Sequence, residues 1–378
     1  MPRLPGRVCD PLLFSKCYTA SLRMGYPIAS SSSLLFSTTK PSKYPPFSPR
    51  GTFKTPPPSN TNKTASTKPI IATVIFTLAA ASVGAVVYFR PGIGRKDIEA
   101  ANMSNKLVPA NPDEVMVIRD VTPNVVTFSV PFLRFGKIPI GGRGTLVKLS
   151  NNTLAIFSPV SLTPSALSRV SSLGSGQVSY IIAPDIEHHI FVSEWARAFP
   201  SAKIIGPEGL PEKRSKITDD ERIGHEPFSV VFTKENKQTI KIDEDFDKDF
   251  DYEYVHSHPN KELVFFYKPD KVLIEADLMF NLPAIEQYSK VPEAEKPHGS
   301  LLGRIFQGMN NTEGEAKGIK RFLWYAISRG DRAGFNESVR RIHEWGFETI
   351  VPCHGETIVG NGKEVFEKVF EWHLVGHK

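Results

Sequence analysis

Short apolar runs separated by turn residues dominate the chain from about residue 115 onward. Many of these runs are rich in β-branched and aromatic side chains, which favour strands. They lie at residues 124–130, 145–149, 153–157, 178–183, 202–206, 228–233, 262–267, 271–276 and 348–353. The early runs follow one another directly, whereas the later ones alternate with helical patterns. The sequence therefore predicts one α/β domain with a mixed sheet arranged in layers.

Four segments show the spacing of apolar residues that is typical of helices. The segment 164–173 follows Thr163, whose hydroxyl can accept a hydrogen bond from the free N–H groups of a helix start. The segment 337–345 has Asn336 as its expected N-cap and Gly346 just beyond its end. The other two helices are expected at residues 190–199 and about 316–328.

Two polar segments lie between these elements. The sequence "KPDK" at 268–271 predicts a tight turn between two strands. The acidic sequence "DEDFDKDFDYE" at 243–253 lacks the glycine turn and the terminal glutamate of an EF-hand calcium loop. We expect this acidic segment to form a solvated loop or an exposed strand face.

A different pattern occupies residues 70–89, where twenty consecutive residues carry no charge. A helix of that length spans about 30 Å, which matches the hydrocarbon core of a bilayer. Basic residues flank the segment on both sides, so charge does not decide its orientation. We expect residues 69–90 to form a single transmembrane helix, and a buried helix of a soluble protein is the alternative.

The charge of the chain changes sharply after this segment. Residues 1–96 contain thirteen Lys or Arg and a single acid, Asp10, whereas the remaining 33 basic and 39 acidic residues lie in 97–378. A basic start rich in Ser and Leu is typical of a mitochondrial presequence, and a disordered basic tail is the alternative. Residues 40–68 are rich in Pro, Ser and Thr, which predicts a linker. We therefore expect a presequence and linker in residues 1–68 and a single-pass protein of a mitochondrial membrane, the inner one.

Charge and cysteine content also exclude some classes of protein. The part expected to fold is mildly acidic and shows no basic face with interleaved aromatic residues, which argues against nucleic-acid binding. Cys353 is the one cysteine after residue 96, so a disulfide within the domain is excluded.

Three of the apolar runs lead into residue types that bind metals. These residues are His188 and His189 after the fourth run, Asp277 after the eighth and His354 after the last. Polar groups at the carboxyl ends of neighbouring strands meet in one crevice, where ligands bind in layered α/β proteins. His258, just before a strand, is a further candidate. Imidazole and carboxylate together suit Zn, Fe or Mn.

Each of these residues also has an ordinary structural role open to it. His354 can be a hydrogen-bonded loop residue, Asp277 can cap a turn, and the adjacent histidines can open a surface helix. Neighbouring side chains on a strand point to opposite faces. Both histidines can therefore reach one metal only if the chain has already turned, which Pro184 allows.

Two longer stretches carry a resemblance to a known family. These are "HPNKELVFFYKPDKVLIEADLMF", with His258 and Asp277, and "FNESVRRIHEWGFETIVPCHGE", with His354. Their order and spacing resemble the metallo-β-lactamase superfamily over about residues 115–370. The resemblance implies an αββα sandwich in residues 110–378 and metal ligands at these three positions.

The chain departs from that family at its signature loop, His-x-His-x-Asp-His. In "PDIEHH", Pro184 and Ile186 stand where the first two histidines belong, His188 stands in place of the aspartate, and only His189 matches. An aspartate of an early strand turn is also replaced, because Ser158 and Pro159 follow "TLAIF". The resemblance thus implies one metal ion rather than two.

Three functions remain open at this point. The first is a membrane-anchored metallohydrolase acting on a small-molecule substrate, although no general base is evident. The second is a non-catalytic binding or scaffold module that keeps the fold, and the third is a mononuclear iron oxidoreductase. Metal content separates them, because Zn favours the hydrolase, Fe the oxidoreductase, and no metal the scaffold.

Overall fold

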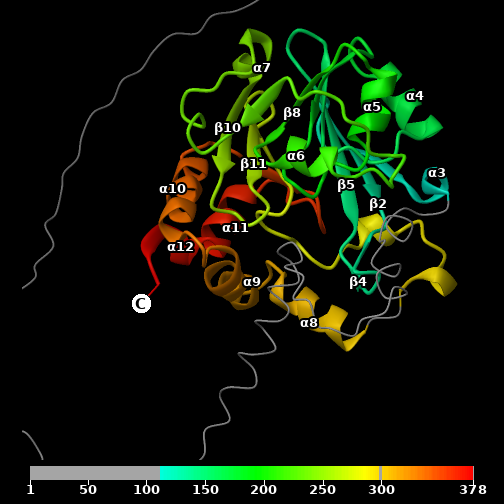
Figure 1. Ribbon diagram of the computed structural model, residues 1–378. Helices are drawn as coiled ribbons and strands as arrows, with labels where there is room; N and C mark the ends of the chain where they lie inside the picture. The colour runs from blue at the N-terminus through cyan, green and yellow to red at the C-terminus, as the bar shows by residue number, and fades with distance from the viewer. Residues whose placement is uncertain (1–110, 298–299, 378) are drawn as a thin grey trace, which may run out of the picture. The chain divides into compact units, whose positions relative to one another are not determined.

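The larger sheet of the protein has seven strands in the order β1-β2-β5-β6-β7-β8-β9 (Figure 1). The computed structural model describes residues 111–297 and 300–377. The first four strands of this order pair antiparallel, and the strands from β6 to β9 pair parallel. Their bounds are β1 Val117–Asp120, β2 Val125–Val130, β5 Gly142–Lys148, β6 Leu154–Phe157, β7 Val178–Ile182, β8 Lys203–Pro207 and β9 Val230–Phe232.

The smaller sheet has four strands in the order β10-β11-β12-β13. Its last pair, β12 and β13, is parallel, so the carboxyl ends of these two strands lie at the same edge. A separate short hairpin joins β3 Leu133–Arg134 to β4 Ile138–Pro139. The bounds of the smaller sheet are β10 Phe250–Val255, β11 Glu262–Tyr267, β12 Val272–Glu275 and β13 Thr349–Pro352.

The two sheets pack face to face through an aromatic core. The ring of Phe157 on β6 lies 5.0 Å from that of Phe265 on β11 and 5.4 Å from that of Phe250 on β10. Alternation along the strands separates this core from the outer layers, since Val125 faces the smaller sheet and Val126 faces the helices. Each large apolar side chain buried in this way contributes about 1.5–3 kcal/mol to stability.

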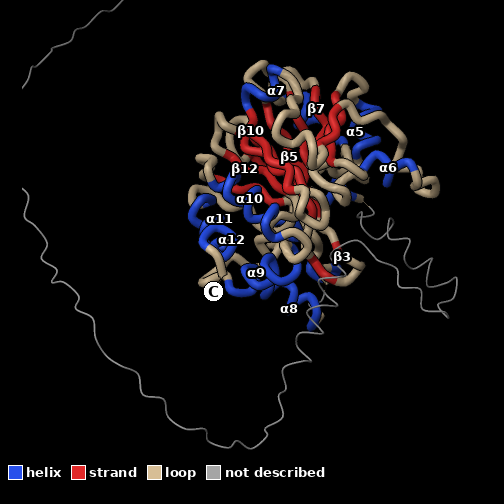
Figure 2. Tube along the Cα trace, turned by 60° about the vertical axis from the view of Figure 1, so that its left-hand side comes forward, coloured by secondary structure: helices blue, strands red, loops and turns tan. Residues whose placement is uncertain are grey.

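Helices cover the outer face of each sheet and complete four layers, αββα (Figure 2). The larger sheet packs against α4 Pro164–Ser172, α5 Val192–Ala198 and α6 Leu210–Ser215. The smaller sheet packs against α9 Lys317–Phe322, the π-helical turn η4 Leu323–Ile327, α10 Arg332–His343 and α11 Gly362–Val369. The αββα sandwich that the family resemblance implies is therefore present. The other helices are α3 Pro112–Val115, α7 Glu244–Asp249, α8 Leu301–Met309, α12 Glu371–Val375 and the 3₁₀ turns η2 Glu286–Tyr288 and η3 Glu293–Glu295.

Most of the predicted elements are confirmed. Each of the nine apolar runs contains a strand, and the sheet is mixed as expected. The Thr163 hydroxyl accepts from the backbone N–H of Ala166 at 3.2 Å, as expected of an N-cap. The turn at 268–271 is closed by a hydrogen bond from the Lys271 N–H to the Lys268 carbonyl.

The expected start of the last predicted helix was wrong. Helix α10 begins at Arg332, and its cap is Asp331, which accepts from the N–H of Gly334 at 2.9 Å. Asn336 therefore lies inside the helix. Phe335 explains the earlier start, because its side chain is fully buried against the smaller sheet.

The expectation for the acidic segment 243–253 was also wrong. It forms α7 and most of β10, with Asp243 as N-cap and the rings of Phe246 and Phe250 stacked in the core. The aromatic residues of this segment fall on buried positions, and their burial outweighs the high density of charge.

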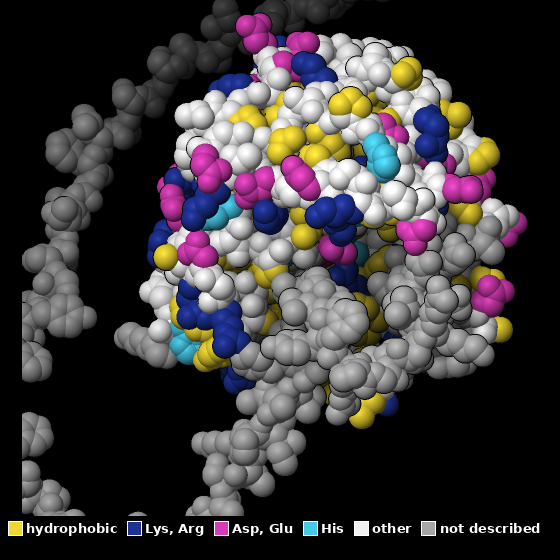
Figure 3. Space-filling view, in the orientation of Figure 1, with side chains coloured by type: hydrophobic (Ala, Val, Ile, Leu, Met, Phe, Trp, Pro, Cys, Tyr) yellow, Lys and Arg dark blue, Asp and Glu magenta, His cyan; other side chains and the backbone are white. Residues whose placement is uncertain are grey.

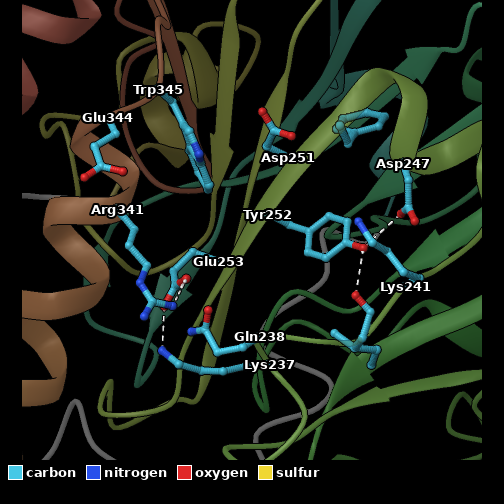
Figure 4. Close-up of a pocket in the computed structure, with 12 residues that line it drawn as sticks. Lys237, Gln238, Lys241, Asp247, Asp251, Tyr252, Glu253, Arg341, Glu344 and Trp345 are labelled. Carbon is cyan, nitrogen blue, oxygen red and sulfur yellow. Dashed lines mark hydrogen bonds and ion pairs between the residues drawn. The ribbon is translucent and has the colours of Figure 1, made fainter.

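A cavity of about 330 Å³ lies beside this segment, between β10 and the end of α10 (Figure 4). Three of its charged side chains form one ion-paired group. The Lys237 ammonium lies 2.6 Å from one oxygen of Glu253, and the Arg341 guanidinium lies 3.6 Å from the other. The Tyr252 hydroxyl donates to Asp247 at 2.9 Å. The acidic residues here therefore serve as counter-ions and acceptors within the fold.

The predictions for the first part of the chain fall outside the described residues. The presequence and linker of 1–68 and the transmembrane helix of 69–90 all precede residue 111. Within residues 111–297 and 300–377, no helix combines the length and the apolar character that crossing a bilayer requires.

Candidate metal centre

The candidate site lies where three segments leave the two sheets. The loop after β7 carries His188, the residues after β12 carry Asp277, and the turn after β13 carries Cys353 and His354. We call these four residues, together with Asp185, the strand-end cluster. All five are buried except His188, whose side chain is 13% exposed.

Asp185 organises the loop after β7. Its buried carboxylate accepts from the backbone N–H groups of Glu187 and His188, both at 2.7 Å, so the chain turns sharply directly after Pro184. Both carboxylate oxygens also lie 2.9 Å from Nδ1 of the His188 ring. That nitrogen therefore carries a hydrogen and donates a hydrogen bond to Asp185. The other ring nitrogen of His188, Nε2, faces the cluster.

His354 is oriented in the same way by a different acceptor. Its Nδ1 lies 2.6 Å from the Gly141 carbonyl, which fixes the proton on Nδ1 and leaves Nε2 free. The following residue, Gly355, has φ +89°, and a Cβ there would lie 2.0 Å from the Asn281 carbonyl oxygen. Only glycine fits at this close approach, so the turn after β13 specifies its sequence.

Arg143 stabilises the turn after β13. Its buried guanidinium donates to the carbonyls of Pro352 and Gly355, at 2.6 and 2.7 Å, and to the Ser129 hydroxyl at 3.0 Å. The two carbonyls bracket Cys353 and His354. Glu286 pairs with the other side of the guanidinium at 3.2 Å and balances its charge.

The free ring nitrogens and a carboxylate oxygen meet at one point. Nε2 of His188 lies 3.1 Å from Nε2 of His354, which in turn lies 3.2 Å from Oδ1 of Asp277. The ligand atoms of His188, Cys353 and His354 all lie within 4.8 Å of one another, as do those of Asp185, His188 and Asp277. Two acceptor nitrogens at this separation repel unless a proton or a cation lies between them.

The electrostatics of the cluster reflect this convergence. Burial alone would lower the pKa of His188, but Asp185, Cys353 and Asp277 raise it well above the usual value. Burial would raise the pKa of Asp277, yet His188 and His354 lower it well below the usual range. Burial also raises the pKa of the Cys353 thiol, and the same two histidines bring it down to about 7.

Buried polar groups next to Asp277 hold it in place through hydrogen bonds. Its other oxygen accepts from the Asn260 amide, and its backbone N–H donates to Glu262 at 3.0 Å. Glu262 also accepts from the N–H of Ala276 at 2.8 Å. Burial raises the pKa of Glu262, and that of Glu275 nearby, well above the usual value.

Three of the five predicted ligands meet in this cluster, namely His188, Asp277 and His354. His189, the one match to the family loop, points elsewhere because the turn at Asp185 sends the two adjacent side chains in opposite directions. Its Nδ1 lies 3.4 Å from the Arg214 guanidinium, which also donates to its carbonyl at 2.8 Å. Burial, followed by the charges of Lys213 and Arg214, lowers the pKa of His189 to about 3.

His258 is close to the cluster but supports it rather than joining it. Its Nδ1 accepts from the backbone N–H of Asn260 at 3.2 Å and lies 3.8 Å from the Glu262 carboxylate. Burial lowers its pKa. In this position His258 holds the loop from which Asn260 reaches Asp277.

Sequence reasoning missed Cys353, Asp185 and Arg143. The first two carried a signal, because Cys353 immediately precedes a candidate ligand and Asp185 precedes His188 by three residues, the spacing of a side chain that caps its own turn. Arg143 carried none, since it reaches the turn after β13 from 209 residues away.

The donor atoms fit a single metal ion of the first transition series. Two imidazole nitrogens, a carboxylate oxygen and a thiol are ligands for Zn or Fe, and both imidazoles have the oxygen partner on Nδ1 that metal-binding histidines almost always show. The residues that would hold the ion are His188, His354 and Asp277, with Cys353 beside them.

Comparisons with known proteins give little beyond the architecture described above. Residues 135–311, less than half of the chain, match a family described as a domain of unknown function, DUF4336. A search of curated proteins finds no match. Solved structures with some similarity include the metal-soaked Flv1 flavodiiron core from Synechocystis sp. PCC6803, at 12% identity over 68% of this chain and 60% of that one, with a TM-score of 0.46. A metallo-β-lactamase from Pontibacter korlensis shares 10% identity over 68% of this chain and 99% of its own, with a TM-score of 0.39. The chain thus spans about 60% of the flavodiiron core.

Proposed function

We propose that the strand-end cluster binds one metal ion and that the protein uses it to hydrolyse a small-molecule substrate. The observation that carries the proposal is the meeting of three potential ligand atoms, Nε2 of His188, Nε2 of His354 and Oδ1 of Asp277, in steps of 3.1 and 3.2 Å. Such atoms are stable this close together only with a proton or a cation between them, and one metal ion meets that need for all three, which favours a metal site over a scaffold.

A bound metal ion would act there as a Lewis acid and would lower the pKa of a coordinated water to about 7. The protein's own groups orient the donors. Asp185 fixes the ring of His188, and the Gly141 carbonyl fixes that of His354. Such oxygen partners raise the basicity of the ligating nitrogen.

The carboxyl groups around the cluster are already used as acceptors. Asp185 accepts from two backbone N–H groups, Asp277 from the Asn260 amide, and Glu262 from two further N–H groups. Glu262 and Glu275 have raised pKa values because they are buried. We therefore assign none of these residues as a general base, and substrate reaches the cluster from the side of His188, its most exposed member.

Two alternatives each rest on one observation. A structural metal in a non-catalytic module is favoured by the burial of Asp277, Cys353 and His354, since structural sites are closed. A mononuclear iron oxidoreductase is favoured by the donor set itself, because two histidines and one carboxylate are the ligands of many non-haem Fe(II) centres.

Elemental analysis of the full-length protein tests these proposals. The protein is purified in detergent without chelator or affinity metal, and metal is measured per folded chain. About one equivalent of Zn together with hydrolysis of chromogenic esters, both lost in His354→Ala, supports the hydrolase. Zn without hydrolysis favours the structural site, and Fe with a redox response favours the oxidoreductase. A folded protein that cannot take up metal contradicts these three and favours a scaffold module without metal.

We also propose that residues 69–90 anchor the protein in a mitochondrial membrane. The uncharged run of 70–89 supports the anchor, and the acid-poor residues 1–68 support the import signal. Carbonate extraction of mitochondria should leave the protein in the pellet. Release into the supernatant contradicts the anchor, and cytosolic fluorescence of a reporter fused to residues 1–60 contradicts the signal.

A further inference from the structure

Helix α8 has apolar residues on its packed side and also on a more exposed side. Gly303 and Phe306 are buried, and Phe306 joins Ile138 and Leu282 in a small core beneath the helix. On the other side, Leu301 is 69% exposed and Ile305 is 43% exposed. Within residues 111–297 and 300–377, nothing covers these two apolar side chains fully.

The hairpin next to α8 extends this apolar surface. Phe135, at the tip between β3 and β4, is 40% exposed and has φ +53°, a conformation that is strained for a bulky residue. Strand β4 packs against α8, since a Cβ on Gly303 would lie 3.5 Å from the ring of Pro139, at van der Waals contact. Figures 1 and 2 both place α8 and this hairpin beside each other at the lower end of the domain. We call Phe135, Leu301 and Ile305 the outer apolar face.

Basic side chains accompany this face. Arg304 lies between Leu301 and Ile305 in the sequence and is exposed, and Lys137 is exposed at the hairpin tip. The Arg134 guanidinium lies 5.3 Å from the centre of the Phe135 ring. Figure 3 shows hydrophobic side chains next to a Lys or Arg at the lower edge of the domain, where Figure 1 draws α8. Exposed apolar groups among Lys and Arg are typical of surfaces that bind anionic bilayers.

The start of the described chain contacts the segment that precedes α8 in the sequence. The Lys290 ammonium, eleven residues before Leu301, donates to the carbonyl of Met116 at 2.7 Å, shortly after the first described residue. Only 21 residues, 90–110, lie between Phe89, the end of the expected anchor, and Asn111. Even fully extended they reach about 75 Å, so the domain stays close to the membrane and a weak surface interaction is enough to orient it.

We propose that the outer apolar face docks on an anionic lipid bilayer, the same membrane in which residues 69–90 are anchored. The proposal rests on the anchor of the proposed function. Docking would place the strand-end cluster next to the membrane, because the small core under α8 also contacts the site. Phe280 lies 6.0 Å from Phe306 of α8 and 4.8 Å from the ring of His354.

Photo-crosslinking of the full-length protein tests the docking. A photoreactive phenylalanine analogue replaces Ile305, and in a matched protein it replaces Leu167 on α4, which is also 43% exposed. Each protein is reconstituted into phosphatidylcholine vesicles with about one-third anionic lipid, floated, and illuminated. We expect about tenfold more lipid adduct at position 305 than at 167, and a severalfold decrease when Arg304→Glu is added.

The outcomes separate the face from the anchor. Protein that floats but gives equal adduct at both positions contradicts docking and leaves the anchor standing. Adduct at 305 with protein that carbonate releases supports docking and contradicts the anchor. Protein that does not float contradicts both. A crosslink from position 305 to another protein, or to residues 1–110 of this chain, also overturns the bilayer as the occupant.

Discussion

Two buried polar clusters lie next to the loop after β7, and each contains one of the adjacent histidines, His188 or His189. In the strand-end cluster, His188 meets other acceptors. In the second, which we call the Arg214 cluster, His189 lies with Ser193 and Glu226 around a guanidinium that donates to the His189 carbonyl, the Ser193 hydroxyl and the Glu226 carboxylate at 2.7–2.8 Å. The residue types are similar, but in the Arg214 cluster donors face acceptors, whereas in the strand-end cluster two ring nitrogens face each other and need a proton or a cation between them.

This difference separates a cluster that binds a ligand from a cluster that only stabilises the fold. A buried group whose partner is complementary is satisfied by the fold alone. A buried group whose neighbours offer the same kind of atom needs something from outside, a proton or a cation. Residue identity does not make that distinction, since both clusters contain histidine and carboxylate. Substitutions in each cluster, and the titration of its histidine, distinguish the two cases experimentally.

Removing a donor of the strand-end cluster should have the largest effect. We expect Asp277→Ala, His354→Ala or His188→Ala to weaken metal binding by more than the 10–100-fold typical of losing a supporting hydrogen bond, because each removes a bond to the ion itself. His189→Ala is the matched control and should keep its metal. Elemental analysis after gel filtration measures the effect. Loss of metal in His189→Ala would erase the contrast between the clusters.

Breaking the Arg214 cluster should affect stability and leave metal content per folded chain unchanged. Arg214 is buried and pairs with Glu226 at 2.7 Å, so Arg214→Ala should lower the free energy of unfolding by about 3–5 kcal/mol. Arg222→Ala, whose pair with Asp220 is more exposed, should cost at most about 1 kcal/mol. Urea denaturation followed by circular dichroism compares the two. Equal effects would mean that burial of the Arg214 pair does not matter.

Loosening the turn after β13 should have an intermediate effect on metal affinity. Arg143→Lys keeps the charge but cannot span the carbonyls of Pro352 and Gly355, so Cys353 and His354 lose their fixed position. We expect metal affinity to fall about 10–100-fold, the usual range for a supporting residue. Competition with a chromogenic chelator gives the affinity. Gln287 also contacts this turn, because its amide donates to the Cys353 carbonyl at 2.9 Å and accepts from the Gly355 N–H at 3.0 Å. Unchanged affinity would show that these bonds hold the turn without Arg143.

Proton binding should show the smallest effect, in the metal-free protein. The pKa of His188 is raised, so its contribution to stability is complete below about pH 6.5 and is lost as pH rises through the folded value. The pKa of His189 is lowered to about 3, so the unfolded chain binds the extra proton and stability falls as pH drops below about 6.5. NMR titration of the two imidazole rings should give a pKa above the usual value for His188 and a pKa below it for His189. Rings that titrate together near their usual pKa would contradict the contrast.

The strands were predictable from sequence because their apolar runs are short, β-branched and bounded by turn residues. Strand β10 and helix α7 were missed, since charge density at 243–253 masks the buried Phe246 and Phe250. The start of α10 was missed because Arg332, its first residue, gives no apolar signal before Phe335. In each case tertiary burial, which local pattern does not contain, decided the outcome.

The sequence predicts those residues of the site that follow the ends of strands. Asp277 and His354 directly follow strands whose partners were foreseeable, so their convergence could be expected. Which of His188 and His189 would join them depends on the turn that Asp185 makes through two backbone hydrogen bonds, and a one-residue difference there reverses the answer. The alignment with the family loop matched His189 rather than His188, because residue identities alone contain no information about the turn at Asp185.

The parallel pairing of β12 with β13 has a consequence for the order in which the protein matures. His188 and His354 are 166 residues apart in the chain, and Arg143 reaches Gly355 over 212 residues. Contacts of such long range form late in folding, after shorter loops have closed. If the strand-end cluster binds a metal ion as proposed, a partly synthesised chain lacks the complete set of ligands, and the ion is expected to bind only after the last strand has taken its place in the sheet.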